Sequence, residues 1–410
     1  MLLKSLCSQA NILTKKTAVG LARPVSSFTA MQRRLNSTTT TDTDTFRASE
    51  IRKTPNDNLK ELVPNQELVF GHTFTDNMLM VEWEAKSGWG KPVIKPYGKI
   101  SLDPSASVLH YSFECFEGMK AYKDKQGRAR LFRPDMNTAR LRRSSERLTL
   151  PSFDTDELTE CIKELVRTDL RWIPSERGYS MYIRPTLIGT SEFIGVGPSD
   201  RAMLFVICCP VGPYYKTGFK AVSLQATTDR VRAWPGGTGD SKIGGNYAPG
   251  ILPQINAVKE GYHQNLWLYG ENDQLTEVGT MNCFVFLKNE QGETELVTPP
   301  LNGLILPGVT RDSILGLARE WNEFKVSERE ITMSEIVKAQ EEGRLIEMFG
   351  TGTACVVSPI RNIGYQGKQI KVPLDPKDPN SQAGPLTRRL NDTLLSIQYG
   401  EIEHPWSVLV

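Results

Sequence analysis

The chain has 410 residues, with 49 Lys and Arg residues against 47 Asp and Glu residues and a formal net charge of +2. At roughly 150 residues per domain, this length predicts two or three domains with a buried core that needs no disulfide or metal support. Hydrophobic residues make up 39% and charged residues 23%, a globular composition that excludes wholesale disorder. The longest apolar run, Ala202 to Cys209, is far too short for a membrane-spanning helix. We therefore expect a soluble protein with neither a membrane nor a nucleic-acid partner.

The charge is unevenly distributed along the chain. The first 41 residues carry six cations and no acid, and they are rich in Ser and Thr. This composition is typical of a mitochondrial transit peptide, which we expect over residues 1–36, with the mature protein in the matrix. The alternative is a disordered basic tail on a cytosolic protein. Residues 37–67 are polar, and we expect them to be loosely ordered.

Cysteine and histidine spacing gives no sign of a metal site. The seven cysteines form no CxxC pair, and the four histidines are scattered. An odd cysteine count also argues against a disulfide framework. Reduced thiols suit a matrix enzyme.

The first half of the chain mixes strands and helices. Residues 78–83 read as a strand, and residues 121–133 as a hairpin around the turn Asp124–Gly127. A helix is expected over residues 136–148. A second helix begins at Asp154, which forms a capping-box pattern with Glu157.

Two apolar strands and a Pro- and Gly-rich stretch follow. Residues 179–189 and 202–210 are the expected strands, the second buried on both faces. The stretch 210–220 is the best domain boundary. It separates an expected small domain, 68–209, from a larger one, 221–410.

The second half has the same mixture. We expect a hairpin over residues 281–298, a helix over 309–324, a capping box at Thr332 and a last amphipathic helix that stops at Gly400. The fold class is therefore α+β in two domains.

The most unusual segment runs from Arg232 to Gly250 and contains six glycines and one lysine, Lys242. The segment is not a P-loop, because Lys242 follows Ser241 instead of preceding a Ser or Thr. One interpretation is a flexible surface loop. The other is a loop that lies close to a flat or anionic ligand, with Lys242 as a Schiff-base nucleophile.

Three further segments have polar groups suited to ligand binding. Glu277 precedes a Gly-Thr turn, which alone more often indicates a solvated residue. Residues 348–357 offer hydroxyls and backbone N–H groups to a phosphate or carboxylate. Residues 301–314 place a turn before a helix, which is either ordinary helix entry or an anion site.

Eight of these segments, in order, resemble the branched-chain amino acid aminotransferases, which are fold type IV pyridoxal-phosphate enzymes. They are VFGHTFTDNMLMVEW, LHYSFECFEGMKA, LFRPDMNTARL, YIRPTLIG, RAWPGGTGDSKIGGNY, LWLYGENDQLTEVGTMN, PPLNGLILPGVTR and FGTGTAC. The resemblance runs from Leu68 to the C-terminus. It implies a smaller N-terminal α/β domain and a larger C-terminal domain with a barrel-like sheet that binds pyridoxal 5'-phosphate.

The resemblance also implies roles for individual residues in cofactor binding. Lys242 matches the lysine that forms the aldimine with the cofactor, Tyr247 the tyrosine at its phenolic oxygen, and Glu277 the carboxylate at its pyridine nitrogen. These three are the expected catalytic residues. The other expected cofactor residues are Arg140, Arg232, Val309, Thr310 and Thr353.

For the substrate, the resemblance implies an aromatic pocket and two groups of polar contacts. Arg184 matches the arginine that receives the side-chain carboxylate of glutamate, and Thr280 and Ala354 match the turn that binds the α-carboxylate. The aromatic residues are Phe70, Tyr111, Phe116, Tyr182 and Tyr214.

Ile194 and Val196 lie in the loop that, in the family, reaches the partner's pocket, which implies a homodimer. The sequence departs from animal mitochondrial members at Cys355-Val-Val-Ser358, where they carry CxxC. A disulfide between positions 355 and 358 is therefore impossible.

The implied reaction is reversible amino transfer from leucine, isoleucine or valine to 2-oxoglutarate, by a ping-pong mechanism. All three branched substrates should be accepted, because a single methylene changes binding by only about 1–3 kcal/mol. The alternatives are a D-amino acid aminotransferase or aminodeoxychorismate lyase on the same fold, or a non-catalytic docking protein.

Overall fold

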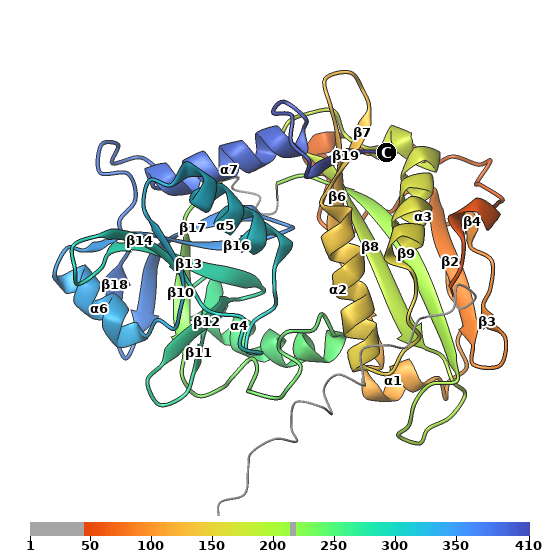
Figure 1. Ribbon diagram of the computed structural model, residues 1–410, viewed down its shortest axis with the longest axis horizontal. Coiled ribbons are helices and arrows are strands. Elements are labelled where there is room, and N and C mark those ends of the chain that lie inside the picture. The colour runs from red at the N-terminus through yellow and green to blue at the C-terminus, as the bar shows by residue number, and fades with distance from the viewer. Residues whose placement is uncertain (1–44, 214–218) are drawn as a thin grey trace, which may run out of the picture. The chain divides into compact units, whose positions relative to one another are not determined.

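The computed structural model describes residues 45–213 and 219–410 (Figure 1). The expected transit peptide and Tyr214 lie outside these residues. Two sheets organise the described chain, one of ten strands and one of nine. Among the described residues, no helix is long and apolar enough to cross a membrane.

The ten-stranded sheet has the order β1-β4-β2-β9-β8-β6-β7-β19, with β3 beside β2 and β5 beside β8. Its pairs are antiparallel except β1 with β4. The longest ladder joins β8 to β9, from Ser180 opposite Val211 to Gly189 opposite Ala202. The strands are β1 (Arg52–Lys53), β2 (Asn77–Glu84), β3 (Gly88–Trp89), β4 (Val93–Pro96), β5 (Glu114–Phe116), β6 (Met119–Lys123), β7 (Ala129–Phe132), β8 (Ser180–Gly189), β9 (Arg201–Val211) and β19 (Ser407–Leu409).

Helices α2 (Pro134–Arg147) and α3 (Thr155–Thr168) lie side by side over this sheet (Figure 1), and the short α1 (Ser107–Tyr111) lies at its end. Helix α3 buries an apolar stripe at helical spacing, which includes Leu158, Ile162 and Leu165. These side chains pack into the core of the ten-stranded sheet.

The described part of the N-terminal segment, residues 45–67, contacts the ten-stranded sheet. Phe46 is buried, with its ring centroid 5.1 Å from that of Trp89, and β1 adds a parallel strand to β4. A buried aromatic ring provides much of the driving force for ordering such a segment. Residues 37–44 lie outside the description.

The nine-stranded sheet closes into a barrel, as expected. Its order is β12-β11-β10-β17-β16-β13-β14-β15, and β12 also pairs with β13, which closes a ring of six strands. Leu, Val, Ile and Met side chains fill the ring. The strands are β10 (Val222–Thr227), β11 (Gln264–Tyr269), β12 (Gln274–Val278), β13 (Met281–Lys288), β14 (Thr294–Thr298), β15 (Lys325–Glu328), β16 (Leu345–Gly352), β17 (Val356–Tyr365) and β18 (Lys368–Lys371).

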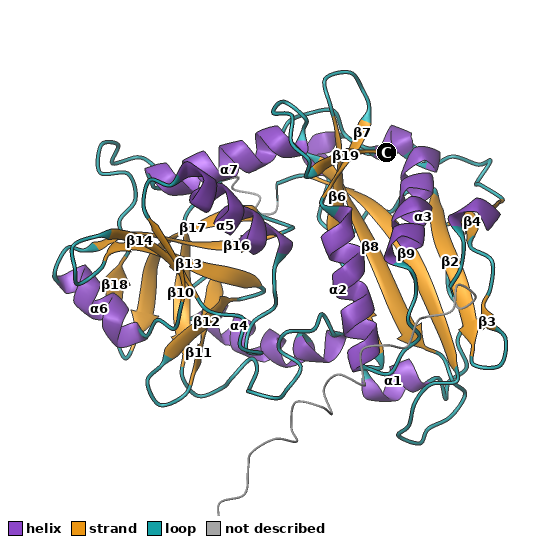
Figure 2. Cartoon of the chain, in the orientation of Figure 1, coloured by secondary structure: helices purple, strands orange, loops and turns teal. Residues whose placement is uncertain are grey.

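Four α-helices pack around the barrel (Figure 2): α4 (Ile251–Lys259), α5 (Val309–Trp321), α6 (Met333–Glu341) and α7 (Pro385–Gln398). Helix α5 ends at Trp321, before the expected Phe324, because Asn322 takes a left-handed conformation. The 3-10 helices are η1 (Ala48–Glu50), η2 (Asn65–Glu67), η3 (Leu170–Trp172), η4 (Gly244–Asn246) and η5 (Ala248–Gly250).

One hydrophobic cluster joins the two sheets. Tyr122 of β6 and Phe132 of β7 pack with buried residues of α5 and α7. The C-terminal strand β19 also returns to the ten-stranded sheet and pairs with β7. Both connections join the ten-stranded sheet to the C-terminal part of the chain.

Candidate active site

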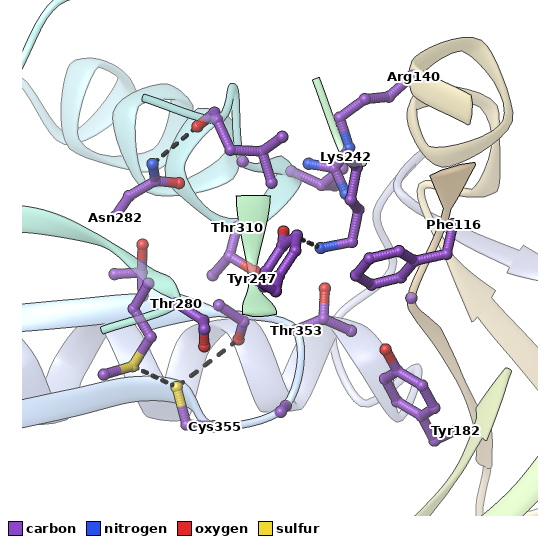
Figure 3. A pocket seen from close by; sticks show the side chains of 18 of the residues that line it. Phe116, Arg140, Tyr182, Lys242, Tyr247, Thr280, Asn282, Thr310, Thr353 and Cys355 are labelled. Atoms are coloured by element: carbon purple, nitrogen blue, oxygen red, sulfur yellow. Dashed lines mark hydrogen bonds between the residues drawn. The ribbon is translucent and has the colours of Figure 1, made fainter. Parts of the chain in front are cut away.

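A cavity of about 220 Å³ is lined by residues from both sheets and from the loops between them (Figure 3). It gathers most of the residues expected from the sequence. These are Phe70, Phe116, Arg140, Tyr182, Arg184, Lys242, Tyr247, Thr280, Val309, Thr310, Thr353 and Ala354.

The glycine-rich loop is held by hydrogen bonds, which does not fit the interpretation as a flexible surface loop. The side-chain amide of Asn246 donates to the Thr238 carbonyl at 2.8 Å and to the Ser241 carbonyl at 2.9 Å. The N–H of Lys242 donates to Ser144 Oγ at 2.9 Å, and its carbonyl accepts from the N–H of Phe116 at 3.0 Å. The backbone of Lys242 is therefore fixed on both sides.

The Lys242 amine faces the cavity (Figure 3). Its Nζ donates to the Tyr247 hydroxyl at 3.2 Å and lies 4.8 Å from the centroid of the Phe116 ring. No carboxylate of the described residues forms an ion pair with it. An amine so placed, beside a phenol and an aromatic face, is available to react with a carbonyl group.

Glu277 lies just behind the wall of this cavity and is 2% exposed. Its Oε2 is 2.8 Å from the Nε of Arg232, and its Oε1 accepts from the N–H of Leu306 at 2.8 Å. Burial raises the pKa of Glu277, and the Arg232 guanidinium and the Leu306 N–H offset part of this rise. Arg232 itself donates to the Leu304 carbonyl at 3.0 Å. The carboxylate is thus held in one orientation.

Arg140 forms a buried ion pair with Glu117, a residue that the sequence reasoning missed. Its Nε lies 2.6 Å from Glu117 Oε1 and its Nη2 2.9 Å from Oε2, while Nη1 donates to the Pro307 carbonyl at 2.8 Å. Asn137 donates to Glu117 Oε2 at 2.8 Å. Although burial acts to raise it, the pKa of Glu117 is held below its usual value by the Arg140 guanidinium.

One wall of the cavity presents unused hydrogen-bond donors. Helix α5 begins after Gly308, and its first intrahelical bond is from Asp312 N to Gly308 O, at 3.0 Å. Among the described residues, no acceptor meets the N–H groups of Val309 and Thr310, which line the cavity. Thr351 Oγ1, also in the wall, is buried without a hydrogen-bond partner. Free N–H groups at a helix N-terminus attract anions.

The opposite wall combines aromatic rings with a cation. The rings of Phe70 and Tyr182 meet edge to face, with centroids 4.9 Å apart. The Arg184 guanidinium lies 4.5 Å from the centroid of Phe116, and its Nη2 donates to the Tyr182 hydroxyl at 3.0 Å. Its Nε is buried and unpartnered among the described residues. A Cβ at Gly118 would come within 2.0 Å of the Tyr182 hydroxyl, so the ring needs glycine there.

Among the described residues, Tyr111 is the expected aromatic pocket residue that does not line the cavity. Tyr111 ends α1, is 45% exposed, and donates its hydroxyl proton to the Ile194 carbonyl. Tyr214 lies outside the described residues. Ile194 and Val196, the expected partner contacts, are 65% and 88% exposed.

Lys120 is a second residue that the sequence reasoning missed. It lies in β6, is 7% exposed, and donates to the Ala354 carbonyl at 2.8 Å. For both Glu117 and Lys120, the one available signal was a charge within the largely apolar segment from Phe113 to Tyr122. Such a residue in a buried strand needs a partner, and the sequence does not say which.

The family described as amino-transferase class IV matches residues 114–363. The cytosolic branched-chain-amino-acid aminotransferase of Saccharomyces cerevisiae is 54% identical over 368 residues, which cover 88% of this chain and 97% of that relative. The mitochondrial enzyme of the same yeast is 53% identical over 368 residues, covering 88% and 93%.

Solved structures agree with this assignment. A crystal structure of the T.th. branched-chain amino acid aminotransferase with pyridoxamine 5'-phosphate matches with a TM-score of 0.61 and 25% identity. The match covers 80% of this chain and 97% of that one. The likeness therefore extends over nearly the whole of both relatives and the solved structure, and this chain belongs to the branched-chain-amino-acid aminotransferases of amino-transferase class IV.

Proposed function

We propose that the protein transfers the amino group of leucine, isoleucine or valine to 2-oxoglutarate, reversibly, with pyridoxal 5'-phosphate as cofactor. The observation that carries this proposal is the Lys242 amine, which faces the cavity beside the Tyr247 hydroxyl, with a buried carboxylate, Glu277, behind the wall. The family relationship supports the same reaction.

The residues present fit a phosphorylated pyridine. The free N–H groups of Val309 and Thr310 and the unpartnered hydroxyl of Thr351 suit a phosphate. Arg140 uses three of its N–H donors on Glu117 and Pro307, which leaves two others and its positive charge. Glu277, fixed by Arg232, suits a protonated ring nitrogen. The T.th. enzyme, which was crystallised with pyridoxamine 5'-phosphate, supports a vitamin B6 phosphate in this fold.

When bound, the cofactor would supply a carbonyl carbon that takes up the amino group and a conjugated ring that accepts the electrons of the Cα–H bond. Lys242 would form the covalent link to it and, once displaced by the substrate amine, would hold the proton that leaves Cα. The Tyr247 hydroxyl, 3.2 Å from the Nζ of Lys242, would orient the Lys242 amine. Each 2-oxo acid must leave before the next one binds, so the kinetics should be ping-pong.

A single site must accept both an aliphatic and an acidic side chain. Phe70, Phe116 and Tyr182 offer apolar faces to a branched chain. Arg184, which lies over the Phe116 ring with an unpartnered Nε, offers a donor to the distal carboxylate of glutamate. Because its cation also rests against aromatic faces, Arg184 stays stabilised when an aliphatic substrate fills the site.

We also propose that the protein is a homodimer. Leu109, Phe193, Ile194 and Val196 expose between 58% and 88% of their surface. Clustered exposed apolar side chains on a folded surface indicate an interaction site. Sedimentation equilibrium should give a dimer, and Val196→Asp should weaken it.

We propose the mitochondrial matrix as its location. Residues 1–36, outside the described part of the chain, have the composition of a transit peptide, and the family has both mitochondrial and cytosolic members. A fluorescent fusion should enter mitochondria with these residues and stay in the cytosol without them.

A steady-state assay tests the reaction. Purified protein with added pyridoxal 5'-phosphate should form glutamate from 2-oxoglutarate and each of L-leucine, L-isoleucine and L-valine. Transfer from D-alanine in place of these would favour a D-amino acid aminotransferase, and pyruvate release from aminodeoxychorismate would favour the lyase. No turnover with any substrate would favour a docking protein.

A further inference from the structure

Lys120 is a buried cation that the proposed chemistry does not use. It is 7% exposed and is the second residue of β6, between Met119 and Ala121, which are themselves buried. Its Nζ donates to the carbonyl of Ala354 at 2.8 Å. Ala354 lies in the turn between β16 and β17, so this bond joins the ten-stranded sheet to the barrel.

A buried lysine without a carboxylate partner is unfavourable for folding alone. Burial lowers the pKa of Lys120 to about 8. Among the described residues, no carboxylate forms an ion pair with Lys120. An apolar side chain of similar length would pack here at less energetic cost, which indicates a role in the site.

The partner of Lys120 is part of the cavity wall. Residues 353–355 form the turn, and all three line the cavity that also contains Lys242. The N–H groups of Thr353 and Ala354 meet no acceptor among the described residues. A trans peptide is planar, so a hydrogen bond to the Ala354 carbonyl fixes the plane of the peptide between Ala354 and Cys355. This peptide is one end of the turn that carries the N–H groups of Thr353 and Ala354.

We propose that Lys120 is a positioning residue for the α-carboxylate of every substrate. Through the Ala354 carbonyl it holds the turn so that the free N–H groups of Thr353 and Ala354 stay available to a carboxylate. Its ammonium also adds positive charge on the far side of the turn, where it favours an anion bound to those N–H groups. This inference rests on the proposed function.

The role differs from that of Arg184 in a measurable way. Arg184 faces the distal carboxylate, which only glutamate and 2-oxoglutarate carry, whereas the α-carboxylate is common to all substrates. Loss of Lys120 should therefore raise KM for L-leucine and for 2-oxoglutarate alike. Because the reacting groups around Lys242 are untouched, kcat should change little.

The test compares holoenzymes of the wild type, Lys120→Met, Lys120→Arg and Lys125→Met. Lys125 lies at the tip of the same hairpin, and its side chain is 78% exposed. The Lys125→Met variant therefore removes an equal charge without touching the turn formed by residues 353–355. Two readouts are needed: KM and kcat for both substrates, and the Kd of 4-methylpentanoate, a carboxylate that cannot react, by titration calorimetry.

We expect Lys120→Met to raise both KM values and the Kd about tenfold with kcat within twofold. Lys120→Arg, which keeps a cationic donor, should recover most of the affinity, and Lys125→Met should match the wild type. Unchanged affinity for 4-methylpentanoate in folded Lys120→Met would overturn the inference, as would a loss confined to 2-oxoglutarate. If Lys120→Met does not fold, Lys120→Gln carries the same test. A wild type inactive on L-leucine would instead refute the proposed function.

Discussion

Replacing Lys120 with methionine should change how the stability of the protein depends on pH. The pKa of this lysine falls from 10.5 to about 8 on folding. At 1.36 kcal/mol per pKa unit, its protonated form is disfavoured in the folded state by about 3 kcal/mol. The variant lacks this unfavourable contribution at neutral pH.

The sign follows from proton binding. Between pH 8 and 10.5 the unfolded chain holds the Lys120 proton more tightly than the folded one, so the wild type gains stability as pH rises through this window. Lys120→Met has no such gain. From about pH 7 to about pH 9.5, the unfolding free energy of the wild type should rise by about 2 kcal/mol relative to that of the variant.

Urea unfolding followed by tryptophan fluorescence, at both pH values and one protein concentration, measures this difference. The variant also loses the hydrogen bond to Ala354, but this loss changes its unfolding free energy by a similar amount at both pH values. The titration of other groups affects the wild type and the variant alike, so both effects largely drop out of the comparison. Lys125→Met, on the exposed part of the hairpin, should follow the wild type. Parallel pH dependences for the wild type and Lys120→Met would refute the assignment of Lys120 as a desolvated cation.

Three further substitutions test the site. Lys242→Ala should abolish turnover and leave the thermal melting curve intact, and near-normal turnover would contradict its role. Glu117→Gln should lower the unfolding free energy by about 3 kcal/mol, because Arg140 keeps a buried charge without its ionic partner. The pKa of Glu117 is lowered on folding, so the ionised carboxylate stabilises the folded protein above its unfolded pKa, and this stabilisation is lost on acidification. The unfolding free energy of Glu117→Gln, measured with urea, should therefore depend less on acid than that of the wild type. Arg184→Gln should raise KM for 2-oxoglutarate about tenfold, as expected for loss of a charged hydrogen bond, with KM for L-leucine within twofold in the same assay.

Local sequence patterns predicted the helices well where a capping residue or an apolar stripe marked them. Asp154 caps α3 as expected and accepts from the N–H groups of Asp156 and Glu157. The return half of the capping box is absent, because the Glu157 carboxylate accepts from the N–H of Ala48 at 2.7 Å. That partner lies more than a hundred residues away, so the spacing of residues around Asp154 carries no information about it.

The polar core of the site was harder to predict for the same reason. The hydrogen bond from Lys120 to Ala354 joins two sheets, and no motif around either residue marks the other. Glu117 forms an ion pair with Arg140, although the hairpin of β6 and β7 and the first turn of α2 separate the two residues in the sequence. The glycines around Lys242 marked its loop as unusual, but its role, like that of Tyr111, comes from the resemblance and stays a prediction.

The domain limits stay a prediction. The strands of the ten-stranded sheet run to Val211, and those of the barrel start at Val222, on either side of the expected linker 210–220. The short strand β19 nevertheless pairs with β7, although it lies in the expected C-terminal domain. A three-residue strand has too little pattern to predict its sheet.

The absorbance spectrum of the holoenzyme, recorded before and after addition of L-leucine, is the most direct test of the proposed amino transfer. The holoenzyme should show a visible band that L-leucine moves to shorter wavelength, with release of 4-methyl-2-oxopentanoate. Addition of 2-oxoglutarate should restore the band. The spectrum of Lys242→Ala should show no such cycle. A wild-type band that L-leucine leaves unchanged and D-alanine moves would contradict the proposed reaction.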